Sequence, residues 1–215
     1  MSVLHEKDRE KVRGFLEKLE NPVRILFFTQ EIECEYCSVT RGMLEEIRGL
    51  NDKISLEIYD IINDKEKADQ YSVEHIPATI LMTNDDVGVR FYGVPGGYEF
   101  MSVIEDLIDL SRDDQELAAP ILNELNKVDK PVTMEVLVTP TCPYCARSVR
   151  AAHKFAMANR NIKGVMIDVP EFPEIGTKYG VTGVPHTVIN GETHVVGALP
   201  EMQMAKKVLE AIGKA

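Results

Sequence analysis

The four cysteines of the chain form two Cys-x-x-Cys pairs, Cys34 with Cys37 and Cys142 with Cys145. Two sulfurs three residues apart on one helical turn can close into a disulfide and open again. Each pair follows a strand-like run and opens a helix-like run, where unpaired backbone N–H groups and the helix dipole favour a negative charge. The thiolate, which is the form that attacks disulfides, is therefore easier to form there. The chemistry that these residues predict is reversible thiol–disulfide exchange.

A proline stands 43 residues after the first cysteine of each pair, at Pro77 and at Pro185. A peptide bond before proline adopts the cis form at a smaller cost than other peptide bonds, and proline cannot occupy the middle of a paired strand. A bend at these prolines can leave the backbone of Ile76 and Val184 free to pair with an extended substrate chain. The alternative is that each proline merely begins a strand.

The two cysteine pairs could instead hold one tetrahedral zinc ion. Zinc sites of this type usually separate the two pairs by about 15–20 residues. Here 105 positions separate Cys37 from Cys142, and each pair lies in its own complete repeat. We therefore expect no metal and no cofactor beyond the redox-active cysteines.

The segments around the two pairs repeat along the chain. Hydrophobic periodicity predicts, in the first half, helices over 5–19, 39–50, 64–71 and 98–110. It predicts strands over 23–29, 54–59 and 87–92, and a segment over 73–81 that runs from a turn into a strand. In the second half it predicts helices over 120–128, 146–159 and 202–212, with strands over 132–138, 165–169, 183–189 and 193–196. A repeat of this size predicts two tandem domains of one fold, which we place at residues 1–116 and 117–215.

Composition excludes several classes of protein. The chain has 24 Lys and Arg against 35 Asp and Glu, and the formal net charge of −11 argues against nucleic acid as the main partner. It has no uncharged run long enough to cross a membrane and no apolar signal segment at its start, so we expect no membrane partner and a cytoplasmic protein. Cysteines confined to such pairs favour redox chemistry over structural disulfides in that compartment.

The motifs resemble those of a known group. Each half is similar to a thioredoxin fold, with Cys-x-x-Cys after the first sheet strand and an apolar residue plus proline before a hairpin; the Cys-Pro-Tyr-Cys form at 142–145 is similar to glutaredoxin. Two such halves resemble the glutaredoxin-like protein disulfide oxidoreductases of thermophilic archaea and bacteria, which are related to protein disulfide isomerase. The resemblance implies an α/β fold of two tandem thioredoxin-like domains, each a mixed four-stranded sheet flanked by helices.

The resemblance also implies roles for individual residues. The first cysteine of each pair attacks a disulfide, the second resolves the mixed disulfide, and the proline is cis. The attacking residues are then Cys34 and Cys142, and the resolving residues are Cys37 and Cys145. The residues that the resemblance places against a substrate chain are Ile76, Pro77, Val184 and Pro185, together with Tyr36 and Tyr144 inside the pairs.

The chain departs from two relatives of this group. It contains no Trp, so it is not thioredoxin proper. The Gly-Gly-Cys/Ser-Asp signature by which glutaredoxins hold glutathione is missing after Pro185, where residues 197–200 read Gly-Ala-Leu-Pro. This difference argues against glutathione as the dedicated partner.

The function predicted from these features is thiol–disulfide exchange on protein disulfides and dithiols, in the reducing, oxidising or isomerising direction. One alternative is an electron carrier between a flavin-dependent thioredoxin reductase and a peroxidase-type client. Another alternative, from a different class, is a non-catalytic module that binds zinc or a peptide.

The two pairs differ in their surroundings. Cys34 stands between Glu33 and Glu35, with Glu31 close by, whereas no carboxylate flanks Cys142. Because neighbouring carboxylates disfavour a further negative charge, we predict that Cys142 is the faster thiol and that the second pair dominates. The alternative is that these glutamates are only a solvated rim, screened by salt.

Two other sets of residues are weaker candidates. His75 and His186 flank the prolines and could exchange protons with a resolving cysteine, although an exposed loop is the commoner place for such histidines. Phe28 and Val136, six positions before each first cysteine, are not acidic. The sequence therefore predicts no buried carboxylate at those positions.

Overall fold

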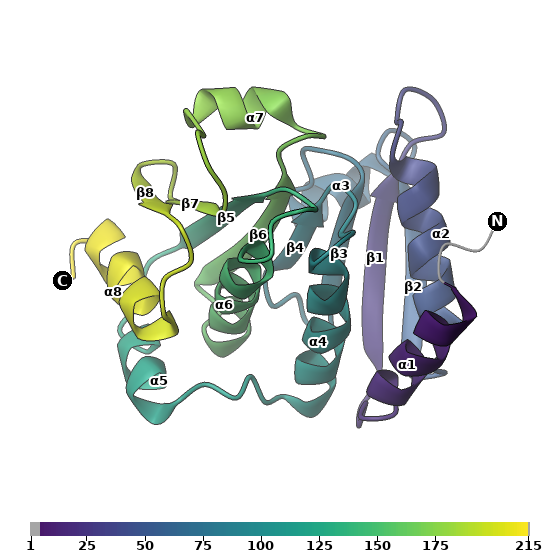
Figure 1. Ribbon diagram of the computed structural model, residues 1–215, viewed down its shortest axis with the longest axis horizontal. Helices are drawn as coiled ribbons and strands as arrows, with labels where there is room; N and C mark the ends of the chain where they lie inside the picture. The colour runs from purple at the N-terminus through teal and green to yellow at the C-terminus, as the bar shows by residue number, and fades with distance from the viewer. Residues whose placement is uncertain (1–4, 215) are drawn as a thin grey trace.

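The computed structural model describes residues 5–214 of the 215-residue chain. Within that range it holds eight helices and eight strands (Figure 1). The first half contains α1 (Glu6–Leu16), β1 (Val23–Thr29), α2 (Cys37–Arg48), β2 (Ile54–Asp60), α3 (Lys65–Tyr71), β3 (Ala78–Met82), β4 (Val89–Tyr92) and α4 (Glu99–Arg112). The second half contains α5 (Ala119–Leu125), β5 (Val132–Val138), α6 (Cys145–Ala158), β6 (Ile162–Asp168), α7 (Pro173–Lys178), β7 (His186–Ile189), β8 (Thr193–Val196) and α8 (Glu201–Ala211).

Each half builds a four-stranded mixed sheet. In the first half β1 pairs in parallel with β2 and antiparallel with β3, and β3 and β4 form a hairpin; β5 to β8 repeat this pattern. The predicted fold of two tandem thioredoxin-like domains is confirmed. The structure adds that β4 and β6 pair in parallel, so the two halves form one sheet in the order β2-β1-β3-β4-β6-β5-β7-β8.

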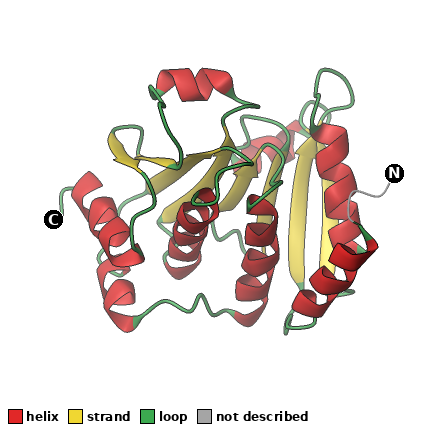
Figure 2. Cartoon of the chain, viewed as in Figure 1, coloured by secondary structure: helices red, strands yellow, loops and turns green. Residues whose placement is uncertain are grey.

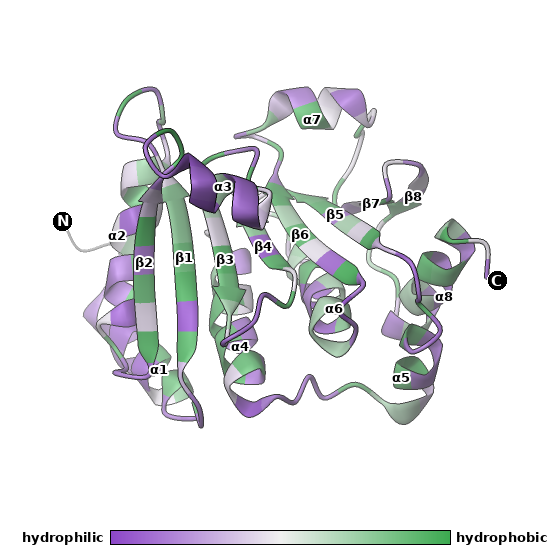
Figure 3. Ribbon diagram, turned by 180° about the vertical axis from the view of Figure 1, so that it is seen from behind, coloured by the Kyte–Doolittle hydropathy of each residue, from purple (hydrophilic) through white to green (hydrophobic). Residues whose placement is uncertain are grey.

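Apolar side chains pack on both faces of this sheet. One face carries a core that is continuous across both halves and is covered by α1, α2, α4, α5, α6 and α8 (Figure 2). On the other face, α3 and α7 contribute to a smaller core. Adjacent strand residues point to opposite faces, so Phe27 lies in the first core and Phe28 in the second. Seen from behind, the strands are largely hydrophobic and α3 is largely hydrophilic (Figure 3).

The observed elements differ from the predicted ones in several bounds and in one helix. Strand β6 begins at Ile162 instead of 165, and the short helix α7 was not predicted. Strand β4 begins at Val89 instead of 87, because Gly88 has a φ of +86° and donates its N–H to Asp86 at 2.8 Å. This turn takes the residues before Val89 out of the strand. The boundary that we predict after residue 116 lies in the segment between α4 and α5, and it stays a prediction.

Helices α4 and α6 carry a buried network of charges between the two halves. Asp106 of α4 is fully buried, and its Oδ2 lies 2.7 Å from Nδ1 of His153 on α6. Its other oxygen pairs with Arg150, which also pairs with Asp109. The second ring nitrogen of His153 lies 3.1 Å from the carbonyl oxygen of Arg90 on β4. The Asp106 carboxylate of the first half thus contacts both His153 and Arg150 of the second half.

Replacing Asp106 with alanine is expected to lower the free energy of unfolding by about 3 kcal/mol, because it removes the partner of the fully buried His153 and one of the partners of the half-buried Arg150. Urea denaturation of the full chain measures this loss. Glu105→Ala is the matched control, since Glu105 contacts the same Arg150 at 3.1 Å but is about half exposed. We expect it to cost less than about 1 kcal/mol, and equal losses for the two variants would contradict this account of the network.

Candidate active site

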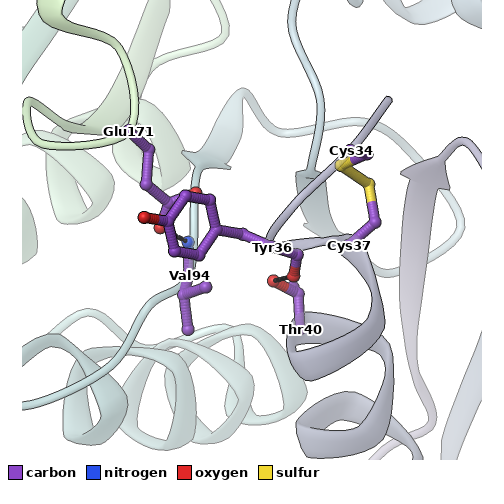
Figure 4. The surroundings of a disulfide bond; sticks show 6 residues. All are labelled: Cys34, Tyr36, Cys37, Thr40, Val94 and Glu171. Atoms are coloured by element: carbon purple, nitrogen blue, oxygen red, sulfur yellow. Dashed lines mark hydrogen bonds between the residues drawn. A yellow bond between two sulfur atoms is a disulfide. The ribbon is translucent and has the colours of Figure 1, made fainter. Parts of the chain in front are cut away.

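The first cysteine pair lies in the turn between β1 and α2. Cys34 and Cys37 form a disulfide with a Cα–Cα distance of 5.5 Å, and α2 begins at Cys37. Cys34 is half-buried, whereas Cys37 is 3% exposed. The carbonyl of Tyr36 accepts hydrogen bonds from the backbone N–H and the hydroxyl of Thr40, at 3.1 Å and 2.9 Å. Figure 4 shows the Tyr36 ring turned away from the disulfide and toward Val94 and Glu171.

The second cysteine pair occupies the equivalent turn between β5 and α6. Cys142 and Cys145 are free thiols; Cys142 is half-buried and Cys145 is completely buried at the first residue of α6. The Sγ of Cys142 lies 3.6 Å from the carbonyl oxygen of Val184. Burial, together with a hydrogen bond to Cys142, raises the pKa of the Cys145 thiol. Of these two sulfurs, only that of Cys142 can meet the disulfide of a large substrate protein. The Cys145 thiol needs a base to take its proton before it can attack.

Both prolines predicted to face the cysteines have cis peptide bonds, Ile76–Pro77 and Val184–Pro185. The contact between Cys142 and Val184 brings the second proline segment against its sulfur pair. The carbonyl of each proline accepts a hydrogen bond from a glycine N–H, from Gly93 at 2.9 Å in the first half and from Gly197 at 2.8 Å in the second. These bonds hold each bend against the end of the neighbouring hairpin.

The two tyrosines inside the pairs reach solvent. Tyr36 is 38% exposed and Tyr144 is 69% exposed. An exposed aromatic ring beside a reactive sulfur offers contact area to a polypeptide. Their predicted role in substrate contact stays a prediction, as do the roles of Ile76 and Val184, which are half-buried.

Glu99, the first residue of α4, is a buried carboxylate that was not predicted. It is 1% exposed, and neither carboxyl oxygen has a hydrogen-bond partner among the described residues. Burial raises its pKa to about 7. It belongs to the first half, yet its charge acts on Cys145 of the second half. The sequence feature that could have indicated the burial of Glu99 is its position on the same face of the helix as Val103 and Asp106, whose side chains are buried.

The histidines differ from expectation. His186 is 5% exposed and so does not lie in an exposed loop; its Nε2 lies 2.9 Å from Nδ1 of His194. His75 is half-buried, and its ring contacts Tyr92 and Phe172. Strand pairing explains the burial of His186, which is the first residue of β7 and lies opposite Leu137 of β5.

Two features of residues 5–214 bear on the alternative functions. No group of three or more His, Cys, Asp or Glu side chains in this range is arranged to hold a metal ion. In the same range, no helix is long and apolar enough to cross a membrane.

Comparisons with known proteins agree with this geometry. A family model described as a thioredoxin domain matches residues 132–210. The crystal structure of a protein disulfide oxidoreductase from Aeropyrum pernix K1 has a TM-score of 0.91 and 29% identity to this chain, covering 98% of this chain and 95% of its own. A structure of the alkylhydroperoxide reductase protein AhpF from Enterococcus faecalis has a TM-score of 0.89 and 26% identity, covering 95% of this chain and 99% of its own.

A curated relative is longer than this chain. The alkyl hydroperoxide reductase protein AhpF from Pseudomonas aeruginosa is 24% identical over 200 residues, which are 93% of this chain and 36% of that protein. The chain thus spans about a third of that relative's length. Together with the two Cys-x-x-Cys pairs and their cis prolines, these matches show that the chain is a thioredoxin-fold protein similar in structure to the Aeropyrum pernix protein disulfide oxidoreductase.

Proposed function

We propose that this chain is a dithiol–disulfide oxidoreductase that acts on protein disulfides and dithiols, mainly through Cys142 and Cys145. The observation that carries the proposal is the second pair. An accessible sulfur lies 3.6 Å from the carbonyl before a cis proline, and a fully buried sulfur stands three residues further on. The similarity to the Aeropyrum pernix protein disulfide oxidoreductase supports the proposal.

The reaction begins with attack by the Cys142 thiolate on one sulfur of the client disulfide. The client S–S bond breaks, the leaving sulfur takes a proton, and a mixed disulfide between Cys142 and the client forms. Cys145 then loses its proton and attacks the Cys142 sulfur. The mixed disulfide breaks, a Cys142–Cys145 disulfide forms, and the client leaves as a dithiol. In the reverse direction the same steps oxidise a client dithiol, and no cofactor beyond the cysteines takes part.

Glu99 is the proposed acceptor of the Cys145 proton. Its pKa of about 7 divides it between the carboxylate and the acid near neutral pH, so it can take a proton and return it. Neither carboxyl oxygen has a hydrogen-bond partner among the described residues, so no other contact competes for that proton. The buried thiol needs this help because burial raises its pKa.

The backbone beside each cis proline is the proposed substrate contact. An extended client chain pairs with the backbone of Val184 near Cys142 while its sulfur meets the nucleophile. Such pairing recognises main chain and has little sequence preference. The first pair is proposed to work in the same way, with Ile76 and the cis proline Pro77 of the first half in the corresponding role.

Turnover of generic substrates tests the broad role. The reduced chain, supplied with dithiothreitol, is expected to reduce insulin and to reactivate scrambled ribonuclease. The curated alkyl hydroperoxide reductase relatives favour a second candidate, electron transfer between a flavin-dependent reductase and a peroxidase-type client. Failure with both generic substrates, combined with turnover by one reductase and one client, would establish that carrier role instead. We propose the cytoplasm as the site of either reaction.

The first pair is expected to be the slower one. Glu31, Glu33 and Glu35 are all exposed around Cys34, where they raise the local negative potential. Alkylation by iodoacetamide in full-length variants that retain only Cys34 or only Cys142 is expected to be about threefold to tenfold faster at Cys142 at low salt. Equal alkylation rates would show that the three glutamates are only exposed to solvent and do not affect the reactivity of Cys34.

A further inference from the structure

The segment 93–98 connects the two candidate sites. At its start, the Gly93 N–H donates to the carbonyl of the first cis proline, Pro77, at 2.9 Å. Near its end, Gly97 approaches the loop of the second cysteine pair so closely that a Cβ there would lie 2.2 Å from the carbonyl oxygen of Pro140. Glu99 follows directly as the first residue of α4. The position of this segment therefore decides where Glu99 lies.

Two carboxyl groups of the second half hold the start of this segment. The Val94 N–H donates to Oε1 of Glu171 at 2.7 Å, a contact drawn in Figure 4. A Cβ on Gly93, which has a φ of +94°, would lie 2.9 Å from Cβ of Asp168 and 3.1 Å from the Glu171 carboxyl carbon. The segment is thus pressed against Asp168 and Glu171 with no space between them.

The side chains of Asp168 and Glu171 both lie against the position that a Cβ on Gly93 would take, and a hydrogen bond between their carboxyl groups contributes to the raised pKa of Asp168. Such a bond needs one proton between the two groups. Asp168 is 3% exposed, and its Oδ1 and the Glu171 Oε2 have no hydrogen-bond partner from another described residue. Burial and the neighbouring Glu171 raise the pKa of Asp168 to about 8.

The charges that face this pair are also negative. Glu99 acts on Asp168, and Glu35 of the first cysteine loop acts on Glu171. The negative charges of Glu99 and Glu35 therefore disfavour ionisation of both Asp168 and Glu171. At neutral pH this favours the form of the pair that keeps one proton.

We propose that Asp168 and Glu171, sharing one proton, are positioning residues for the exchange reaction: they fix the segment 93–98 and so hold Glu99 in the buried position from which its charge acts on Cys145. This inference rests on the proposed role of Glu99. Loss of the shared proton leaves two facing carboxylates, whose repulsion loosens the contact with Val94. The rate of resolution by Cys145 then falls above about pH 8, although thiolate chemistry alone would make it rise.

The test follows two phases of one reaction in the full chain with Cys34 and Cys37 replaced by serine. Reduced protein is mixed with 5,5′-dithiobis(2-nitrobenzoate). The first release of thionitrobenzoate reports attack by Cys142, and the second reports resolution by Cys145. Glu171→Ala is expected to slow the second phase about tenfold at neutral pH and to leave the first phase within about twofold of its rate.

Glu171→Gln separates a shared proton from a merely structural contact. The amide oxygen still accepts from Val94, and the amide N–H₂ donates to the Asp168 carboxylate at every pH. This variant is expected to match the parent at neutral pH and to lose the decline above about pH 8. The exposed Glu174 of α7 supplies the control Glu174→Gln, which should keep the decline.

The outcomes distinguish two failures. Absence of both phases in the parent would overturn the proposed function. Two normal phases with a second phase unchanged in Glu171→Ala would overturn only the positioning role. If the second-phase rate still declined above about pH 8 in Glu171→Gln, or did not decline in the parent, the proposal of a shared proton would be wrong. This comparison does not depend on whether Glu171→Ala folds.

Discussion

Replacing Cys142 with serine is expected to lower insulin reduction about threefold to tenfold, because only the slower first pair then remains active. Cys142 is the half-buried sulfur of the second pair, whereas Cys145 is completely buried and cannot meet the disulfide of a large client. No other group at this site can take over the attack. The rate of insulin reduction, with dithiothreitol as the reductant, measures the loss.

Cys34→Ser is the matched comparison for Cys142→Ser, because each variant removes the first sulfur of one pair. We expect Cys34→Ser to reduce the same activity less than about threefold, since the second pair is predicted to dominate. A large loss in Cys34→Ser with little loss in Cys142→Ser would reverse the assignment of the dominant site.

Replacing Glu99 with glutamine is expected to slow resolution of the mixed disulfide about 100-fold, the scale of general acid–base catalysis. Glutamine cannot accept the Cys145 proton, so the mixed disulfide between Cys142 and the client accumulates. In the parent, the resolution rate should rise with pH up to about 7, where Glu99 ionises. The change of slope near pH 7 should be absent from the variant, in which the rate follows only the ionisation of the Cys145 thiol. Quenched-flow mass measurements of the mixed disulfide follow both effects.

The same substitution is expected to stabilise the protein. In the unfolded chain this carboxyl ionises near its ordinary pKa of 4.5, but in the folded chain only near 7. Folded stability therefore falls as the pH rises between these values, and above pH 7 the ionised Glu99 destabilises the fold. Glu99→Gln removes this penalty and should raise the free energy of unfolding by about 1–3 kcal/mol at alkaline pH. If Glu99→Gln slowed resolution but lowered the free energy of unfolding, the ionised Glu99 would not be the destabilising buried carboxylate that we describe.

The sequence predicts local features of this protein well. The equal 43-residue spacing from each first cysteine to its proline reflects a repeated fold, and it led to two tandem domains. The resemblance to known disulfide oxidoreductases implied the two cis bonds. The apolar run Val23–Thr29 is buried by neighbours on both sides and appears as β1 with the predicted bounds. Such features depend on residues close together in the chain, where periodicity and turn chemistry act directly.

Features that depend on contact between the halves were not predicted. The parallel pairing of β4 with β6 joins two edges, such as Val89 opposite Gly164, that no local pattern relates. Glu99 is predicted on a helix, but only packing against the second half buries it and lets its charge act on Cys145. A hydrophobic pattern shows which residues are buried, not which distant segment covers them.

Trapping of the mixed disulfide tests the central claim most directly. Cys145→Ser removes the resolving sulfur, so a client that is attacked stays attached. Digestion of the trapped complex with insulin, followed by mass spectrometry, is expected to find the insulin cysteine linked to the peptide that contains Cys142. Linkage only to the peptide that contains Cys34, or the absence of any trapped complex, would contradict the account.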